Sequence, residues 1–289
     1  MKFALPPRAT RVSPAVAAAL IVAGLACGPV GTRMAAAQSS PPKFQAASVN
    51  AVYQISLNGF DVGSFRYTSQ IDGQAFKLTS DVELSLLMGA FHWKGLSQTS
   101  GMTGAALPKP AAFSFDYSSS LKSGAVHIGF AKGGVETVSI DPPSPFDPDT
   151  VAVKPEHLVN VLDPLSAILA LTQDTGAKPC DRKLAIFDGK QRFDLQLIFR
   201  RQEPIEGTAE QVSVCRVKYI PIAGYRATEE TANLARATGI EISFRQLASA
   251  RLLVPQKIVL PTLAGNAEIT VQHVDLTTPG SGQVALINE

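Results

Sequence analysis

The sequence lacks the residue patterns on which most catalytic and metal sites depend. It holds only three cysteines and four histidines, and no histidine has a second histidine or a cysteine at metal-ligand spacing. The motifs H-E-x-x-H and G-x-S-x-G are absent, and so are the glycine loops that bind nucleotide phosphates. We therefore assign no catalytic, metal or cofactor site and expect a protein that is not an enzyme.

Positive charge is also scarce. The chain has 26 Lys and Arg against 24 Asp and Glu, and four of the basic residues lie in the first 37 positions, which hold no acidic residue. Without those positions, 22 basic residues face 24 acidic ones. The remaining Lys and Arg are scattered, so the sequence excludes a bulk attraction to nucleic acid.

The first 37 residues have the layout of a secretory signal peptide. A basic start is followed by an apolar run over residues 15–27 and by small residues up to Ala37. We expect cleavage between Ala37 and Gln38. The run is shorter than the ~20 residues of a transmembrane helix. The sequence thus predicts a periplasmic mature chain without a transmembrane span.

Cys27 leaves one alternative to this location. A cysteine at the end of such an apolar run can be a lipidation site, but a large aliphatic residue usually stands three positions earlier. Here that position is Gly24. Cleavage after Ala37 is the preferred prediction, and a lipid anchor through Cys27 is the alternative.

Two cysteines remain in the mature chain, Cys180 and Cys215. In an oxidising compartment an even pair favours a disulfide bond. The alternative is two buried free thiols. The pair lacks the C-x-x-C spacing of a redox site.

Alternation of apolar and polar residues dominates the chain from Val49 onward. Residues 49–57 place every second side chain on an apolar face, which is the period of a half-buried strand. Asn58-Gly59 then provides a strong hairpin signal. Further strands are predicted near 62–69, 76–84, 91–103, 111–118, 123–130, 134–140, 183–187, 191–200, 211–220, 239–247, 252–260 and 266–276. The sequence thus predicts an all-β fold, in which a curved antiparallel sheet forms an open or partial barrel.

One or two short helices interrupt this pattern. Residues 141–155 contain five prolines and predict an extended crossing loop. Asp163-Pro164 then begins a short apolar helix, with Asp163 as its N-cap, and we expect this helix to be buried against the sheet as a plug or lid. Residues 227–237 predict a second, more exposed helix. The expected organisation is a signal peptide (1–37), a flexible lead-in (38–48), a single β-rich domain (49–276) and a C-terminal tail (277–289).

Charged residues gather in the sequence around Cys180. Asp181, Asp188 and Asp194 lie close to arginines, which favours an ion-pair network that fixes a hairpin; a functional site is the alternative. The aromatic residues are concentrated early in the chain. If the sheet curls without closing, some of them would line a concave apolar groove.

Three segments resemble the exported bacterial family known as domain of unknown function 3108. They are Y-x-I-x-L-N-G-F-D-V-G from Tyr53, D-P-L-S-A-I-L-A-L from Asp163, and C-D-R-K-L-A-I-F-D-G-K-Q-R-F-D-L from Cys180, which V-C-R-V-K-Y-I-P-I-A-G-Y-R follows. The resemblance implies an envelope location and a β-rich fold, and supplies no catalytic residues. Cys180 and Cys215 also resemble a recurring cysteine pair in part of the family, which supports the disulfide.

These observations favour a non-enzymatic periplasmic cell-envelope protein. Its expected partner is a lipid, a lipoprotein or another envelope protein's segment, held in the concave face of the sheet. One alternative is a structural or interaction module whose apolar face is filled internally. Another is an envelope hydrolase with a dispersed site, which a cleft containing Asp181, Asp188, Asp194 and a histidine would favour.

Overall fold

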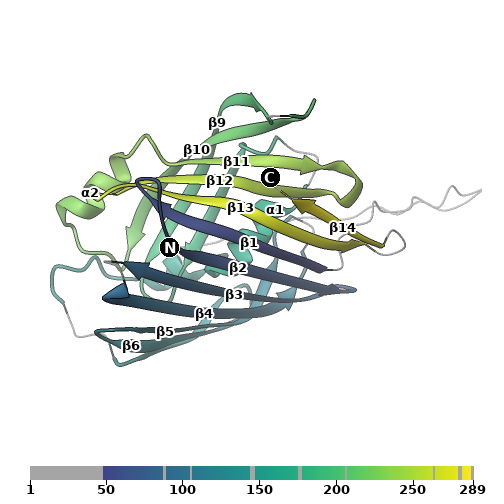
Figure 1. Cartoon of the computed structure of the whole chain (residues 1–289). Coiled ribbons are helices and arrows are strands. Elements are labelled where there is room, and N and C mark those ends of the chain that lie inside the picture. Colours follow the sequence, from purple (N-terminus) through teal and green to yellow (C-terminus); the bar gives the residue numbers. More distant parts are fainter. Residues whose placement is uncertain are drawn as a thin grey trace, which may run out of the picture. The chain divides into compact units, whose positions relative to one another are not determined.

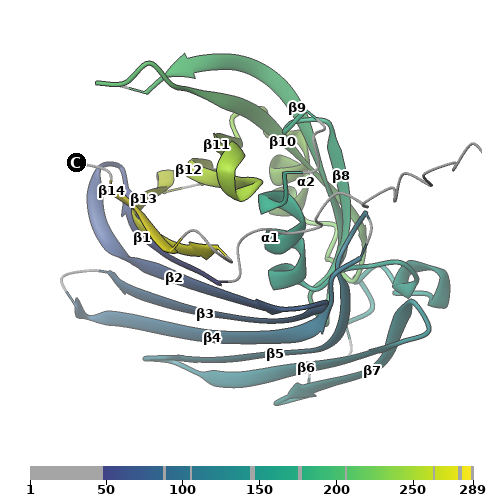
Figure 2. The same ribbon diagram turned by 90° about the vertical axis from the view of Figure 1, so that its right-hand side faces the viewer.

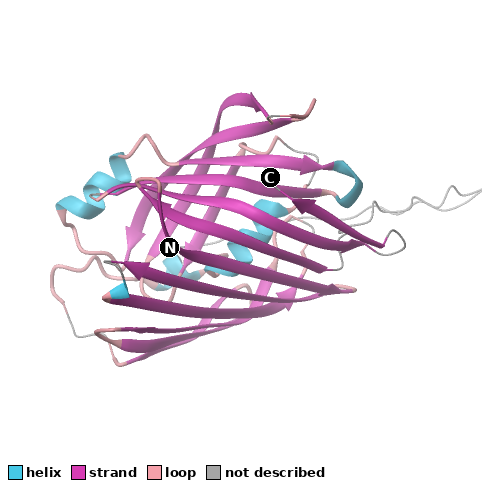
Figure 3. Ribbon diagram, viewed as in Figure 1, coloured by secondary structure: helices cyan, strands magenta, loops and turns pink. Residues whose placement is uncertain are grey.

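The computed structural model describes residues 48–287, apart from 87–88, 105, 144–146, 175–177, 206, 263 and 279–281. The predicted signal peptide, Cys27, the Ala37–Gln38 cleavage site and the lead-in up to residue 47 lie outside the described residues. In the described part the chain is mainly β-strand with short helices (Figure 3).

A single antiparallel sheet contains all the strands of the described part (Figure 1). The strands are β1 (Ser48–Leu57), β2 (Phe60–Asp72), β3 (Ala75–Leu86), β4 (Phe91–Met102), β5 (Lys109–Ser119), β6 (Ser123–Ala131), β7 (Gly134–Asp141), β8 (Arg182–Phe187), β9 (Arg192–Pro204), β10 (Gln211–Ala223), β11 (Glu241–Leu247), β12 (Leu252–Thr262), β13 (Gly265–Thr278) and β14 (Gly282–Ile287). The predicted all-β fold with a curved, open antiparallel sheet is confirmed.

The strand order follows from two meanders, the first formed by β1 to β7 and the second by β8 to β13. Neighbouring strands run β7-β6-β5-β4-β3-β2-β1-β13-β12-β11-β10-β9-β8, and β14 pairs with β13. The chain therefore starts in the middle of the sheet and pairs outward, strand after strand, to the β7 edge. It then crosses to the opposite edge at β8 and pairs back until β13 meets β1.

The hairpin turns depend on residues that tolerate positive φ. Asn58 and Gly59, between β1 and β2, have φ of 52° and 83°. Both values match the turn predicted from the Asn-Gly pair. Gly189, between β8 and β9, has φ of 99° and also faces β6, because a Cβ atom there would lie 2.3 Å from Val126 Cγ1. This turn therefore packs closely against a strand of the other meander.

The chain between β7 and α1, called the crossing segment here, joins the two edges of the sheet. In the described part the edge strands β7 and β8 do not pair with each other. Residues 159–162 of that segment contact both edges. Asn160 N donates to Gly133 O beside β7 at 2.8 Å, and Leu162 N donates to Ala185 O of β8 at 2.9 Å. Phe187 N of β8 donates back to Leu162 O at 2.9 Å. The segment thus spans the gap between the edges with a few backbone hydrogen bonds.

Helix α1 (Pro164–Thr172) follows directly and lies inside the curve of the sheet (Figure 2). Asp163 caps it, because its Oδ1 accepts a hydrogen bond from Ser166 N at 3.0 Å, as the sequence predicts. Leu165 and Leu169 pack into a core cluster with Phe76, Leu78 and other residues of the first meander. Ala167 and Ala170 pack against β8. The helix therefore contacts both meanders.

Two other segments refine the sequence-based picture. Helix α2 (Glu229–Arg236), capped by Thr228, lies within the predicted 227–237 helix. Part of the predicted C-terminal tail forms a strand that the sequence did not predict. Strand β13 continues to Thr278, and β14 pairs with its final part. The sequence missed β14 because its V-A-L-I run is short and shows no alternation.

Candidate functional site

An apolar cavity of about 220 Å³ lies between α1 and the concave face of the sheet. Strands β1, β2, β11, β12 and β13 supply one wall, and α1 supplies the other. All the described residues that line it are uncharged. An engineered void of ~150 Å³ with apolar walls admits benzene, so this cavity is large enough for a small apolar ligand or part of a chain.

The alternation of the strands explains the apolar wall. Val49, Ala51 and Tyr53 of β1, which the sequence places on one face, line the cavity together with Phe65 and Tyr67 of β2. The early aromatic residues thus contribute to a concave apolar surface. The expectation that part of them would line such a surface is confirmed for these positions.

A separation between two strands creates space beside the cavity. Strand β12 pairs with β13 only from Lys257 to Thr262, whereas its first residues pair with β11. From His273 to Thr278, β13 pairs with β14 instead. Pro255 lies where β12 leaves β13, and it has no N–H to donate to a neighbouring strand. The cavity lies at this separation, since it is lined by Pro255 and by Val274 of β13.

One polar atom in the cavity wall lacks a partner. Tyr67 is 5% exposed, and its Oη has no hydrogen bond. Burial raises the pKa of this hydroxyl far above its usual value, an effect that the neighbouring Ser69 hydroxyl partly opposes. The two side chains nevertheless lack hydrogen-bonding geometry. Ser69 also lines the cavity, whereas the Oη of Tyr67 is sealed in the interior beside it.

The N-terminal end of α1 is held by a buried acid. Asp163 is fully buried, and its Oδ2 lies 2.5 Å from Ser166 Oγ and 3.1 Å from Thr99 Oγ1 of β4. Thr99 Oγ1 is also 2.8 Å from Ala112 O, and one hydroxyl has a single proton. A protonated Asp163 donates to Thr99 Oγ1, which leaves the single Thr99 proton for Ala112 O. The carboxyl of Asp163, the hydroxyl of Thr99 and the carbonyl of Ala112 are then all hydrogen-bonded. Burial likewise raises the pKa of Asp163, against the opposing effect of the Ser166 and Thr99 hydrogen bonds.

The C-terminal end of α1 is held by a cation. Arg182 donates from Nη1 to Ala170 O at 2.7 Å and to Leu171 O at 3.2 Å, and from Nη2 to Gln173 O at 2.7 Å. These carbonyls lack partners within the helix and carry its negative dipole end. Arg182 therefore satisfies the end of the helix from which Leu171 and Thr172 face the cavity.

A disulfide fixes the strand that carries Arg182. Cys180 and Cys215 are bonded, with their Cα atoms 5.2 Å apart, so the predicted bond is present. Cys215 lies in β10 and is fully buried, next to a cluster that includes Phe244 and Leu253. The bond ties the start of β8 to β10, two residues before Arg182.

The acidic residues near Cys180 have separate roles. Asp188 closes the β8–β9 turn by accepting from Lys190 N at 2.8 Å and Gln191 N at 2.6 Å. Asp194, which is 5% exposed, pairs with Lys183 at 2.9 Å and with Arg192 at 2.5 Å. The described residues contain no group of three His, Cys, Asp or Glu side chains suited to a metal ion.

The ion pairs of Asp194 agree with the hairpin network that the sequence favours, whereas Asp188 joins the hairpin through backbone N–H groups. Burial by itself raises the pKa of Asp194, yet the hydrogen bonds and charges of Lys183 and Arg192 outweigh it and hold that pKa below its usual value. This pairing links β8 to β9 on the same hairpin that the Asp188 turn closes.

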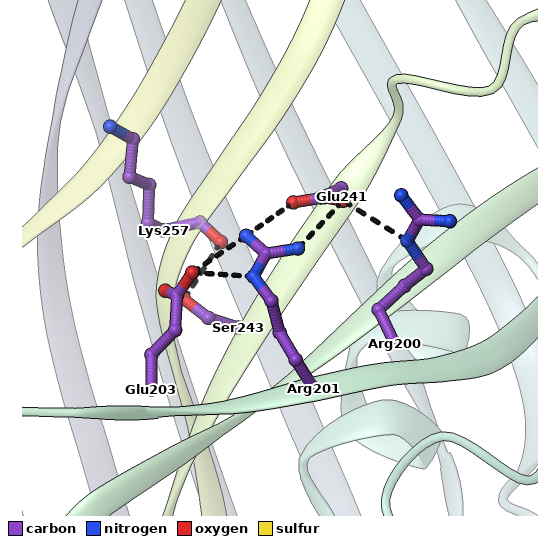
Figure 4. Close-up of polar contacts among 6 residues, drawn as sticks. All are labelled: Arg200, Arg201, Glu203, Glu241, Ser243 and Lys257. Carbon is purple, nitrogen blue, oxygen red and sulfur yellow. Dashed lines mark hydrogen bonds and ion pairs between the residues drawn. The ribbon is translucent and has the colours of Figure 1, made fainter.

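The outer face of the sheet carries a charged network that sequence analysis missed (Figure 4). Arg201 of β9 donates to both carboxylate oxygens of Glu241 of β11, at 3.0 and 2.9 Å, and also pairs with Glu203. Arg200 lies 3.6 Å from Glu241 as well. A bulge between β9 and β10 lets these consecutive arginines reach one carboxylate. Glu241 is adjacent to Ile242, whose side chain lies on the opposite face, in the cavity wall.

These features define a class of protein: an open, curled antiparallel sheet that encloses a buried helix and an apolar cavity. In the described part, neither helix has the length and hydropathy of a membrane span. The family model described as "Protein of unknown function (DUF3108)" matches residues 52–244, and the chain belongs to this family.

No curated protein matches the chain. Among solved structures, it is similar to a crystal structure described as a "Beta-barrel-like Protein of Domain of Unknown Function DUF1849" from Brucella abortus. The two are 11% identical with a TM-score of 0.49, over 81% of this chain and 99% of the other.

Proposed function

We propose that this protein is a non-enzymatic component of the cell envelope, exported to the periplasm, that holds an apolar ligand in the cavity beneath α1. The ligand is a lipid chain, carried free, on a lipoprotein or on a partner. The observation that carries the proposal is the uncharged cavity of about 220 Å³ in the interior of the sheet. Pockets that bind small ligands are typically lined by apolar side chains with a few polar groups.

The arrangement around α1 supports binding as the role of the cavity. The helix covers one side, and both of its ends are held to the sheet by side chains, through the contact of Asp163 with Thr99 of β4 and through Arg182 of β8. A cover anchored in this way keeps the apolar walls apart, because α1 cannot settle into the cavity without breaking those hydrogen bonds. The leader-like first 37 residues support export.

A cavity-filling variant tests the proposal. Ala51 lines the cavity, so Ala51→Leu should reduce binding of an apolar fluorescent dye at least tenfold while it leaves stability unchanged or higher. Ala111→Leu, at an exposed position of β5, is the control and should bind the dye as the wild type does. Equal dye binding by the wild type and Ala51→Leu would reject the cavity as the site. N-terminal sequencing of the exported chain should begin at Gln38.

One observation favours a second candidate, a structural module with a filled interior. Helix α1 already occupies much of the concave face, and its residues join two core clusters. If the concave face serves only as the hydrophobic core, the protein would bind neither dye nor lipid. Ala51→Leu would then change only the stability of the protein.

A further inference from the structure

The apolar cavity is elongated and follows the direction of the strands. Val49 and Tyr53 of β1 both line it, and they are four residue steps apart, which is ~14 Å along a strand. On β13 the lining extends from Ile269 to Val274, which is ~17 Å. A round void of the same volume would be about half as long. The cavity is therefore a passage that runs along the interior of the sheet.

One end of this passage, called the closed end here, is sealed by the fold. Gln173, directly after α1, forms a bridge with Leu252 at the start of β12, so the helix side and the sheet side meet at this point. Leu252, Val49 and Val274 line this end, and they are 3%, 8% and 1% exposed. A ligand in the cavity therefore ends against these side chains.

The opposite end, called the open end here, faces solvent. Ile258 pairs with Ile269, and Ile269 pairs with Ile55 of β1, so these residues lie beyond Tyr53 and away from the closed end. Phe65, Ile258 and Ile269 line the cavity and are all partly exposed, unlike the side chains at the closed end. A ligand therefore enters and leaves the cavity past these three residues.

The volume of the cavity indicates its width. A void of ~150 Å³ holds the six carbons of benzene, so about 220 Å³ corresponds to roughly nine carbons. Three backbone bonds of a strand advance ~3.4 Å, so a length of ~14 Å corresponds to about twelve bonds of an extended chain. The space thus holds no more than about one carbon for each bond of its length. Two chains side by side would need about twice this volume, so the cavity is one chain wide.

We propose that the cavity binds a single unbranched hydrocarbon chain, whose methyl end lies against Val49 and Val274 at the closed end. About nine to twelve carbons fit inside, and the rest of the ligand leaves past Ile258 and Ile269 at the open end. This inference rests on the proposed function and adds the shape and the length of the ligand. Val49 acts as a specificity-determining residue, because its side chain limits how far the chain can enter.

A series of straight-chain alcohols from hexan-1-ol to tetradecan-1-ol tests this inference, by displacement of an apolar dye from the exported chain. Affinity should rise about fourfold with each added carbon that enters the cavity. It should then reach a plateau between about nine and twelve carbons, where further carbons remain outside. Cyclodecanol should bind at least tenfold more weakly than decan-1-ol, because its ring is wider than one chain.

Val49→Ala should move the plateau to alcohols that are about two carbons longer, since it removes two methyl groups at the closed end. Val138→Ala is the matched control, because Val138 lies in β7 and is 42% exposed, and it should leave the plateau where the wild type has it. Ile258→Ala should not move the plateau to longer alcohols, because space gained at the open end joins the opening. Melting temperatures of the three variants separate a change in length preference from a loss of fold.

The results distinguish the two proposals. Affinity that rises without a plateau, or cyclodecanol binding as tight as that of decan-1-ol, would overturn the single chain, while the cavity would remain a ligand site. An unchanged plateau in folded Val49→Ala, or a longer one in Ile258→Ala, would overturn the placement of the closed end. Failure of the dye and of every alcohol to bind the wild type would reject the proposed function itself.

Discussion

The two ends of α1 are held by opposite chemistry. At the N-terminal end, a buried carboxyl without a cationic partner is bound by hydroxyls and a backbone N–H of the first meander and the helix. At the C-terminal end, Arg182 of the second meander donates from its guanidinium to three carbonyls at the end of α1. Arg182 follows the disulfide-bonded Cys180 by two residues. Only Arg182 brings a charge that matches the helix dipole at its end, whereas Asp163 acts through its hydrogen bonds.

The comparison teaches how an open sheet can support a cavity. Its edges at β7 and β8 are not paired with each other in the described part, so the sheet alone does not fix the distance between the meanders. Helix α1 is attached to one meander through Asp163 and to the other through Arg182. The helix therefore fixes the distance between the two meanders and also covers the cavity.

The largest effect is expected from the disulfide at the C-terminal end. Cys180→Ser should destabilise the protein by ~4 kcal/mol, because the bond closes a long loop. For a chain of this size the melting temperature should fall by roughly 8–16 °C. Calorimetry with and without reductant provides the measurement. An unchanged melting temperature in the variant and in the reduced wild type would show that the bond does not support this end.

A smaller loss is expected from the cation itself. Arg182→Met keeps much of the apolar stem but leaves three carbonyls without their donor, and should cost about 2 kcal/mol in urea denaturation. Dye affinity should fall as well, because Leu171 and Thr172 lose their fixed position. Arg201→Met is the control on the outer face. If Arg182→Met binds dye like the control, the C-terminal attachment of α1 is not needed for the cavity.

The N-terminal end should respond to pH, since burial raises the pKa of Asp163 in the folded protein. Its favourable contribution is complete below the pKa of the unfolded state and is lost as pH rises through the folded pKa. Asp163→Asn remains neutral and preserves the cap. Its stability relative to the wild type should therefore increase from pH 4 to pH 7.

Asp194 provides the opposite control for that titration. Its pKa is lowered by Lys183 and Arg192, so its contribution is present above the unfolded pKa and is lost on acidification. Asp194→Asn should therefore lose stability relative to the wild type as pH rises from 3 to 6. Denaturant curves at several pH values check both variants, and slopes of the same sign would contradict the assignment.

The smallest effect is expected on the outer face. Arg201→Gln breaks its pairs with Glu203 and Glu241, but Arg201 is 44% exposed. Exposed pairs contribute about 0–1 kcal/mol, and salt weakens them. A loss of at most about 1 kcal/mol in urea, smaller still in 1 M salt, is the expected outcome. A loss as large as that of Arg182→Met would show that the sheet, and not α1, holds the meanders.

Much of the fold could be predicted because the sequence signals of strands and helix caps lie within a few neighbouring residues. Alternation identified the inward residues of β1, and Asp163-Pro164 identified the start of α1. Strand β14 was not predicted, and its six residues pair with β13 where β12 has left that strand. That separation depends on three strands at once and is not visible as a pattern in any one of them.

The site was less accessible to sequence reasoning. Tyr67 looks like any other inward aromatic residue until the surroundings of its hydroxyl are known. Arg182 was grouped with its sequence neighbour Asp181, whereas its partners are carbonyls at the end of α1. The bulge that brings Arg200 and Arg201 to Glu241 likewise depends on strand register, which single-sequence patterns do not supply.

Native mass spectrometry of the exported chain, purified without detergent, tests the central claim most directly. The account predicts a protein species carrying one apolar molecule, and a marked loss of that species in Ala51→Leu but not in Ala111→Leu. A spectrum of bare polypeptide for the wild type, together with no uptake of an added apolar dye, would contradict it.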